Sequence, residues 1–140
     1  MIHCLELKKN DRVLEIGTGT GYQTVMLANL CKHVCTIEKF QELLDQAKTN
    51  HKKLKLKNIN YMLGNGADGW NKPVLFDAII VSASVEKISP KLLKNLKDKG
   101  KLIFPKKYPF GKQKLLLLKK ISNSKYASQK LFDVEFVPLL

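Results

Sequence analysis

Three glycines and one glutamate carry the clearest chemical signal in the sequence. Gly17, Gly19 and Gly21 alternate within the stretch VLEIGTGTGYQT (13–24), where a strand-like run meets a helix-like one. Glycines in such a turn let the backbone approach a ligand closely and turn helix N-terminal amides towards it. Glu38 follows seventeen residues after Gly21, at the end of the next strand-like run. A carboxylate in that place can accept the hydroxyl protons of a ribose, so these residues predict a nucleoside site.

The spacing of these residues favours one nucleoside cofactor, S-adenosylmethionine. A glycine turn alone is also an ordinary strand-to-helix connection, so the acid at Glu38 carries much of the argument. The glycines follow the spacing GxGxG and not the GxGxxG of dinucleotide-binding folds. The chain also ends in a hairpin-like pattern, where a nicotinamide-binding fold would repeat a second mononucleotide-binding half. Methyltransferase domains that bind S-adenosylmethionine close their parallel sheet with an antiparallel strand.

Strand-like and helix-like segments alternate along most of the chain. Short apolar runs predict five strands, over residues 12–17, 33–38, 58–63, 75–82 and 101–105. Between the first two, Tyr22, Val25, Met26 and Leu30 recur near helical period within 22–31. Such alternation predicts an α/β domain with a mainly parallel sheet.

Two further helices are predicted from their apolar spacing and their caps. The first has Phe40, Leu43, Leu44 and Ala47 at the i, i+3, i+4 and i+7 positions of one buried face. The second begins at Ser89 and Pro90, with a buried stripe of Leu92, Leu93 and Leu96, and Gly100 is expected to end it.

The last third of the chain predicts an antiparallel hairpin. Residues 114–121 and 130–138 are strand-like and are joined by the polar stretch SNSKYASQ, with no helix between them. Phe132, Val134 and Phe136 alternate with acidic residues, so one face of the last strand is expected to be buried. The predicted fold is therefore one domain over residues 1–140, Rossmann-like, with a C-terminal antiparallel hairpin.

The composition fits one globular domain and carries a large positive charge. The chain has 140 residues, 44% of them hydrophobic, and a net charge of +13. Such a charge can indicate a polyanionic partner. Of the 25 basic residues, however, only Arg12 is an arginine, the residue that nucleic-acid sites favour. The lysines are spread along the whole chain, which favours solvated lysine faces over a nucleic-acid groove.

The cysteines and histidines predict no metal site. Cys4, Cys31 and Cys35 are odd in number and lack CxxC spacing, which disfavours both a disulfide framework and a zinc site. The three histidines are scattered. We expect reduced thiols that pack as small apolar residues.

No membrane span or secretory signal is predicted. The longest uncharged apolar run covers residues 115–118, far short of the roughly 20 residues that span a bilayer. The charges near the N-terminus follow the apolar residues, which is the reverse of a secretory signal. These features predict a cytoplasmic protein.

Several stretches together resemble the protein-L-isoaspartate O-methyltransferase family. They are, in order, DRVLEIGTGTGYQTVMLA, VCTIEKFQELLDQAK, GNGADGW, FDAIIVSAS and EFVPLL, with GTGTGYQ and FVPL the most specific. The resemblance implies methyl transfer from S-adenosylmethionine to the free α-carboxylate of isoaspartyl residues in damaged proteins. The ester then closes to a succinimide, whose hydrolysis returns part of the population to aspartate. It implies isoaspartyl-containing proteins and peptides as partners of a protein expected to be monomeric.

The resemblance also implies roles for particular residues. Those expected to hold the cofactor are Gly17, Thr18, Gly19 and Gly21 around its methionine and ribose end, Tyr22 and Gln23 at its edge, Glu38 at the ribose, and Asn65 and Gly66 at the adenine. Those expected to border the methyl-transfer site are Ser82, Ala83 and Ser84. No catalytic acid or base is expected, because a carboxylate is already a nucleophile and a sulfonium already an activated donor, so positioning and a dry site suffice.

Three departures from the family pattern temper this interpretation. The family's Gly-Asp-Gly is Gly64, Asn65 and Gly66 here, and its PGG turn is replaced by residues 98–100. No match is found to the family's N-terminal segment, whose Thr-Ile-Ser motif helps to bind the substrate carboxylate and covers the cofactor. Impaired activity is therefore expected.

Two alternatives remain open. One is a non-catalytic domain that binds S-adenosylmethionine. The other is a nucleic-acid methyltransferase, which is disfavoured because residues 81–84 read Val-Ser-Ala-Ser, and not [DN]PP[FY], and because no cysteine follows a proline.

Overall fold

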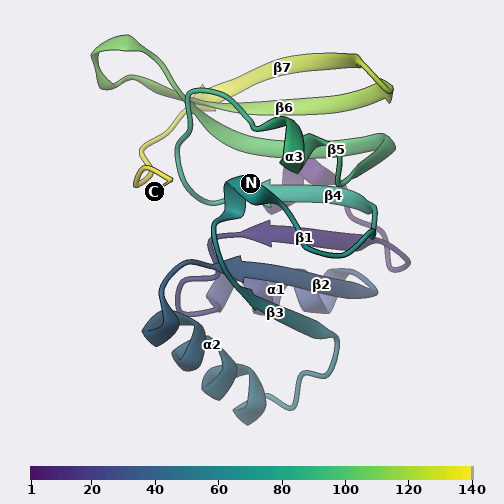
Figure 1. Cartoon of the computed structure of the whole chain (residues 1–140), viewed down its shortest axis with the longest axis vertical. Coiled ribbons are helices and arrows are strands. Elements are labelled where there is room, and N and C mark those ends of the chain that lie inside the picture. The colour runs from purple at the N-terminus through teal and green to yellow at the C-terminus, as the bar shows by residue number, and fades with distance from the viewer. Residues whose placement is uncertain (140) are drawn as a thin grey trace.

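One seven-stranded sheet organises the chain, in the order β3-β2-β1-β4-β5-β6-β7 (Figure 1). The computed structural model describes residues 1–139. The strands are β1 (Arg12–Ile16), β2 (His33–Glu38), β3 (Ile59–Leu63), β4 (Phe76–Val81), β5 (Leu96–Lys107), β6 (Gln113–Ser122) and β7 (Lys125–Asp133). Strands β1 to β5 pair in parallel, and β6 and β7 continue the sheet antiparallel. The predicted α/β fold with a C-terminal antiparallel hairpin is confirmed.

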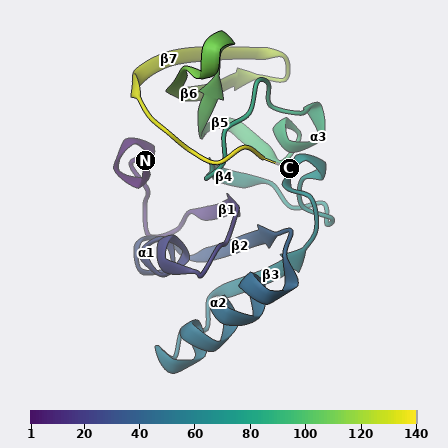
Figure 2. The same cartoon turned by 90° about the vertical axis from the view of Figure 1, so that its left-hand side faces the viewer.

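Helices cover both faces of the sheet. The helices are α1 (Tyr22–Leu30), α2 (Gln41–Lys53) and α3 (Pro90–Leu93), with short 3-10 turns η1 (Ile2–Leu5), η2 (Gly66–Asp68) and η3 (Pro109–Gly111). Figure 2 shows η1 and α1 on one side of the sheet and α3 on the other. Val13 and Ala78 pack towards η1 and α1, whereas Leu14 and Ile79 pack towards α3. The central strands β1 and β4 are therefore apolar on both faces, as parallel strands under two helical layers require.

The helix predicted to run from Ser89 to Gly100 is much shorter than expected. Its start is correct, because the Ser89 hydroxyl accepts the N–H of Leu92 at 3.2 Å, but α3 ends at Leu93. The backbone then enters the sheet: the N–H of Phe76 donates to Asn95 O at 2.7 Å, and Leu96 pairs with Phe76. Burial of Leu96 in the sheet outweighs its helix propensity here.

Helix α1 buries a different face from the one that its apolar residues suggested. Tyr22, Met26 and Leu30 are 77%, 40% and 47% exposed, while Thr24 and Leu27 are buried. The helix is apolar around most of its circumference, so its sequence contains no strong periodic signal for one face.

The C-terminal hairpin is longer and tighter than predicted. Strands β6 and β7 extend into the polar stretch and leave only Asn123 and Ser124 in the turn. β7 ends at Asp133, and Phe132 is 54% exposed, so the predicted buried face is wrong within this strand. Val134 and Phe136, which follow the strand, are partly buried, as the alternation predicted. β7 is the last strand of the sheet, and both of its faces lie mostly in solvent.

Among the described residues, Cys31 and Cys35 are buried free thiols, as expected, and Cys4 is partly buried and free. Burial raises the pKa of Cys31 and that of Cys35 to about 11, because desolvation disfavours the thiolate. In residues 1–139 no helix is both long and apolar enough to cross a bilayer.

Candidate functional site

The candidate site is a cavity of about 410 Å³ at the carboxyl ends of the parallel strands. It lies where the chain order reverses between β1 and β4, the place where open α/β sheets bind ligands. Its walls come from the glycine turn, the end of β2, the start of α2, the ends of β3 and β4, and the C-terminal segment. The lining residues are Ile16, Gly17, Gly19, Ile37, Glu38, Lys39, Phe40, Leu43, Gly64, Gly66, Ser82, Ala83, Val137, Pro138 and Leu139.

The glycine turn is held by a backbone hydrogen bond to β2 and by the ring of His51, which leaves no room for a side chain at Gly21. Gly17 N–H donates to Ile37 O at 2.9 Å, which ties the turn to β2. Gly21 has a φ of 91°, and a Cβ there would lie 2.4 Å from His51 Nε2. That ring nitrogen is 2.8 Å from Gly21 O and must donate to it, so a neutral His51 accepts the Tyr61 hydroxyl proton at Nδ1. His51 thus braces the turn, a role that its isolated position in the sequence did not suggest.

Glu38 fixes the turn as well as lining the cavity. Its Oε1 accepts the N–H of Gly19 at 2.8 Å, and its Oε2 accepts those of Lys39 at 2.9 Å and Phe40 at 3.0 Å. Each carboxylate oxygen offers two lone pairs, so Oε1 retains one for a ligand hydroxyl while Oε2 is already occupied. The side chain is 6% exposed, which favours a strong charge-assisted bond to a ligand.

A second carboxylate, Glu15, lies fully buried beneath the turn, and the sequence reasoning missed it. Its Oε1 accepts the hydroxyl protons of Thr36 at 2.7 Å and of Thr24, and its Oε2 accepts Gln23 Nε2 at 2.9 Å. The Thr18 hydroxyl lies 2.6 Å from the Thr36 hydroxyl and completes this network. The signal was present in the sequence, because a glutamate within the apolar strand RVLEI must find hydrogen-bond donors once buried.

The Glu15 network reaches the cavity through Gln23. Gln23 Nε2 also donates to Ser82 Oγ at 2.7 Å, so one buried carboxyl group connects β1, β2, α1 and the end of β4. Burial raises the pKa of Glu15, and the charge of Glu38 adds to this, while the hydrogen bonds from Thr24, Thr36 and Gln23 oppose it. Because Ser82 Oγ accepts from Gln23, its own proton is free to bond a ligand.

Six of the residues expected from the family resemblance line the cavity together. They are Gly17, Gly19, Glu38, Gly66, Ser82 and Ala83. Gly66 passes so close to β1 that a Cβ would lie 2.1 Å from Ile16 Cγ2. This close packing accounts for a glycine at that position.

The other six expected residues lie behind or beside this cavity. Thr18 and Gln23 face the Glu15 network, Gly21 packs on His51, and Tyr22 is exposed. The side-chain oxygen of Asn65 accepts Ala67 N–H at 3.0 Å and caps η2, and Asn65 and Ser84 line an adjacent cavity of about 490 Å³.

The C-terminal segment forms the wall between the two cavities. Ser84 N–H donates to Val137 O at 2.8 Å, and Leu139 N–H donates to Ser84 O at 3.0 Å. Pro138 and Leu139 line both cavities. The stretch FVPL, singled out from the sequence only as a family marker, therefore has a structural role at the site.

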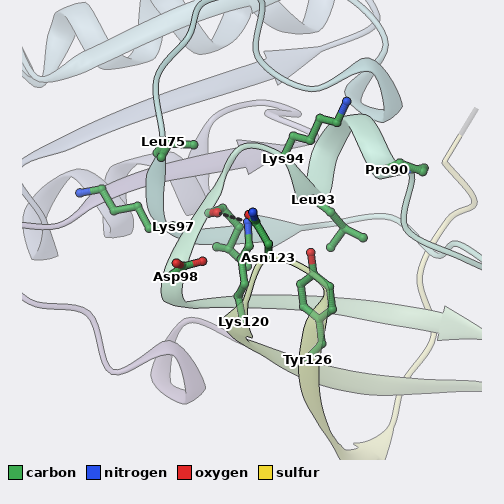
Figure 3. Close-up of a pocket in the computed structure, with 10 residues that line it drawn as sticks. Leu75, Pro90, Leu93, Lys94, Lys97, Asp98, Lys120, Asn123 and Tyr126 are labelled. Atoms are coloured by element: carbon green, nitrogen blue, oxygen red, sulfur yellow. Dashed lines mark hydrogen bonds between the residues drawn. The ribbon is translucent and has the colours of Figure 1, made fainter.

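A larger hollow of about 510 Å³ lies at the other end of the parallel strands, where β4 and β5 begin (Figure 3). It contains none of the predicted site residues. Lys94 and Lys97 point away from it, and the buried ammonium of Lys120 donates to Leu96 O at 2.8 Å. Its size alone does not make it a binding site, and the smaller cavity at the glycine turn remains the candidate site.

Comparison with known proteins agrees with this geometry. The family model described as Protein-L-isoaspartate(D-aspartate) O-methyltransferase matches residues 1–140. The chain belongs to this family. It is 40% identical to protein-L-isoaspartate O-methyltransferase 1 of Nitrosospira multiformis over 139 residues, which are 99% of this chain and 59% of that protein. It is also 40% identical to the Vibrio vulnificus protein-L-isoaspartate O-methyltransferase, over all of this chain and 66% of that protein.

Solved structures of the protein-L-isoaspartate O-methyltransferase family superpose closely on this fold. One described by that name gives a TM-score of 0.91 at 25% identity, over 98% of this chain and 44% of its own. Another, from Plasmodium falciparum and described as a complex with S-adenosyl-L-homocysteine, gives a TM-score of 0.81 at 29% identity, over 95% and 67%. The chain thus spans 59% to 66% of the length of the two curated relatives named above.

Proposed function

We propose that this chain binds S-adenosylmethionine in the cavity at the glycine turn and transfers its methyl group to the α-carboxylate of isoaspartyl residues in damaged proteins. One observation carries the proposal: the buried Glu38 carboxylate holds Gly19 at 2.8 Å beside a cavity of nucleoside size, with a lone pair left on Oε1. Membership of the protein-L-isoaspartate O-methyltransferase family supports the choice of substrate.

Polar and apolar lining residues would contact different parts of the ligand. Glu38 Oε1 would accept a ribose hydroxyl proton, and Gly17 and Gly19 would let the ligand approach the backbone. Ile37, Phe40 and Leu43 provide an apolar wall that suits an adenine ring. When bound, S-adenosylmethionine supplies an activated methyl group.

The remaining task is to hold a carboxylate in line with that methyl group, and we assign it to Ser82. Its hydroxyl proton is free, because its oxygen accepts Gln23 Nε2. It can therefore donate to one substrate oxygen while the other attacks. Glu38 and Lys39 are the titratable side chains that line this cavity among the described residues. Neither is needed as a general base, since the substrate carboxylate is already ionised.

We also infer the oligomeric state, the cellular location and the partners of the protein. We infer a monomer, since a net charge of +13 makes copies repel one another. Free buried thiols at Cys31 and Cys35 support a reducing, cytoplasmic environment. Isoaspartyl proteins and peptides are the proposed partners.

We expect the chain to bind S-adenosylmethionine or S-adenosylhomocysteine in preference to NAD. The cavity lies at one glycine turn of GxGxG spacing, and the hairpin of β6 and β7 stands where a second mononucleotide-binding half would follow. Isothermal calorimetry with each of the three ligands tests this. Tighter binding of NAD would overturn the cofactor assignment.

Glu38→Ala is expected to weaken S-adenosylhomocysteine binding by about 2 kcal/mol, roughly thirtyfold, because it removes a charged acceptor of a ligand hydroxyl and releases the turn at Gly19. Calorimetry measures the loss, and circular dichroism checks that the fold is retained. Glu42→Ala is the matched control, since Glu42 is an exposed glutamate in the first turn of α2. Equal affinity of the two variants would remove Glu38 from the site.

A further inference from the structure

The antiparallel part of the sheet carries most of the positive charge of the chain. Residues 96–133, from the start of β5 to the end of β7, contain eleven lysines and two carboxylates, a net charge of +9 out of +13. Lysines occur throughout the sequence, but carboxylates are rare in this stretch. The excess charge is therefore concentrated on one part of the fold, where it attracts anions.

Within this region the end of β5, the connection to β6 and the start of β6 combine four lysines with no acid. We call residues 105–114 the basic hairpin; it contains Lys106, Lys107, Lys112 and Lys114 and no acid. Tyr108 N–H donates to Lys112 O at 2.7 Å and closes the turn. The hairpin therefore presents its lysines on a defined backbone.

Most of these ammonium groups have no carboxylate partner. Among residues 1–139 Lys114 lies 3.9 Å from Asp133, but no carboxylate lies within 4.0 Å of Lys106, Lys107 or Lys112. Lys106 and, from β7, Lys130 each lie 5.3 Å from the centre of the Tyr108 ring. Two cations on one ring repel each other, and a bound anion would relieve that repulsion.

The basic hairpin lies next to the candidate site. Val85 N–H donates to Pro105 O at 3.0 Å and Lys107 N–H donates to Val85 O at 2.8 Å, so the hairpin is tied to the loop after β4. Lys107 lines the 490 Å³ cavity with Ser84. Figure 1 shows the hairpin projecting on the same side as the C-terminus and the carboxyl ends of β1 and β4.

An aromatic side chain stands at the tip of the hairpin. Phe110 is fully exposed and has a φ of 64°. Phe110 lines a hollow together with Lys112, Lys114, Asp133 and Glu135. An exposed ring among cations offers an apolar contact to a partner that also brings negative charge.

We propose that the basic hairpin binds acidic stretches of polypeptide that flank the isoaspartyl residue, so that the chain prefers substrates rich in aspartate and glutamate. This inference rests on the proposed function, because a neighbouring site that methylates isoaspartyl residues brings a polypeptide to the hairpin. A polypeptide fits better than a nucleic acid, since the hairpin contains no arginine and nucleic-acid sites favour that residue.

The test uses two fluorescent isoaspartyl peptides, one with acidic flanks and one with serine and glutamine in their place. Their affinities for residues 1–140 with S-adenosylhomocysteine are measured by anisotropy at low and at physiological ionic strength. We expect the acidic peptide to bind about tenfold more tightly at low salt. Lys107→Gln with Lys112→Gln should remove most of this preference. Lys52→Gln with Lys53→Gln removes the same charge from exposed positions on α2 and should retain it.

Further arms separate this inference from the proposed function. If, in a chimera that carries the N-terminal part of a longer relative before Met1, an aspartyl twin of the acidic peptide binds as well as the isoaspartyl one, the proposed function fails, but the hairpin proposal does not. If the two double variants behave alike, or if the wild-type chain shows no preference for acidic flanks, the hairpin proposal fails. If a single-stranded oligonucleotide binds more tightly than the acidic peptide, and loses affinity in the hairpin variant, the ligand of the hairpin is a nucleic acid and the polypeptide proposal fails.

Discussion

Residues 1–140 produced alone are expected to bind S-adenosylhomocysteine but to methylate an isoaspartyl peptide at least about a hundredfold more slowly than a chimera that carries the N-terminal part of a longer relative before Met1. The family resemblance assigns substrate binding and water exclusion in part to that N-terminal segment. The described walls of the cavity instead come from the strand ends, the start of α2 and the C-terminal segment. Loss of positioning alone can cost several kcal/mol of barrier.

Radiolabelled methyl transfer to isoaspartyl and aspartyl forms of one peptide measures this difference. A second chimera, with alanines in place of the Thr-Ile-Ser triplet, is the control that separates substrate binding from added length. Rapid, isoaspartyl-selective turnover by residues 1–140 alone would show that the segment is dispensable. Failure of the intact chimera to methylate, despite cofactor binding, would favour the non-catalytic alternative.

The predictions that agree with the structure rest on signals that each lie within one short stretch of the sequence. The glycine turn and Glu38 could be found because each ends an apolar strand, and parallel strands bring their carboxyl ends to one edge. The hairpin of β6 and β7 was visible because no helical pattern separates its strands. Gly66, Ser82 and Ala83 followed from the family resemblance, since their own sequence context says little.

What was missed depends on contacts between distant segments. The length of α3 is set by the pairing of Leu96 with Phe76, which no local pattern records. His51 reaches Gly21 across thirty residues. The C-terminal segment lies against Ser84 through two backbone hydrogen bonds, and backbone bonds leave no trace in residue types. Glu15 does have a sequence signal, an acid within an apolar strand, but that signal does not identify its donors, Thr24 and Thr36, which come from other segments.

Glu15→Ala is expected to destabilise the fold by about 3 kcal/mol and to weaken S-adenosylhomocysteine binding, because the buried hydroxyls of Thr24 and Thr36 and the amide of Gln23 lose their acceptor. Through Gln23 the change also releases Ser82 at the cavity. Urea unfolding measures the stability, and calorimetry measures the binding. Glu86→Ala, at an exposed position after β4, is the control and should change neither by more than a few tenths of a kcal/mol.

Glu15→Gln adds a test of the charge itself. Burial raises the pKa of Glu15 above its ordinary 4.5 in the folded chain, whereas the unfolded chain has the ordinary value. Above about pH 4.5 the unfolded state therefore releases this proton first, and the wild-type fold loses stability as pH rises towards the folded pKa. Below that pH both states are protonated and the contribution is constant. Glutamine keeps one acceptor oxygen but does not titrate. The free energy of unfolding of Glu15→Gln should therefore increase relative to that of the wild type as pH rises. A difference between the two proteins that stays constant from pH 4 to 8, or one that changes in the opposite direction, would show that burial does not raise the pKa of Glu15 and that its hydrogen bonds dominate.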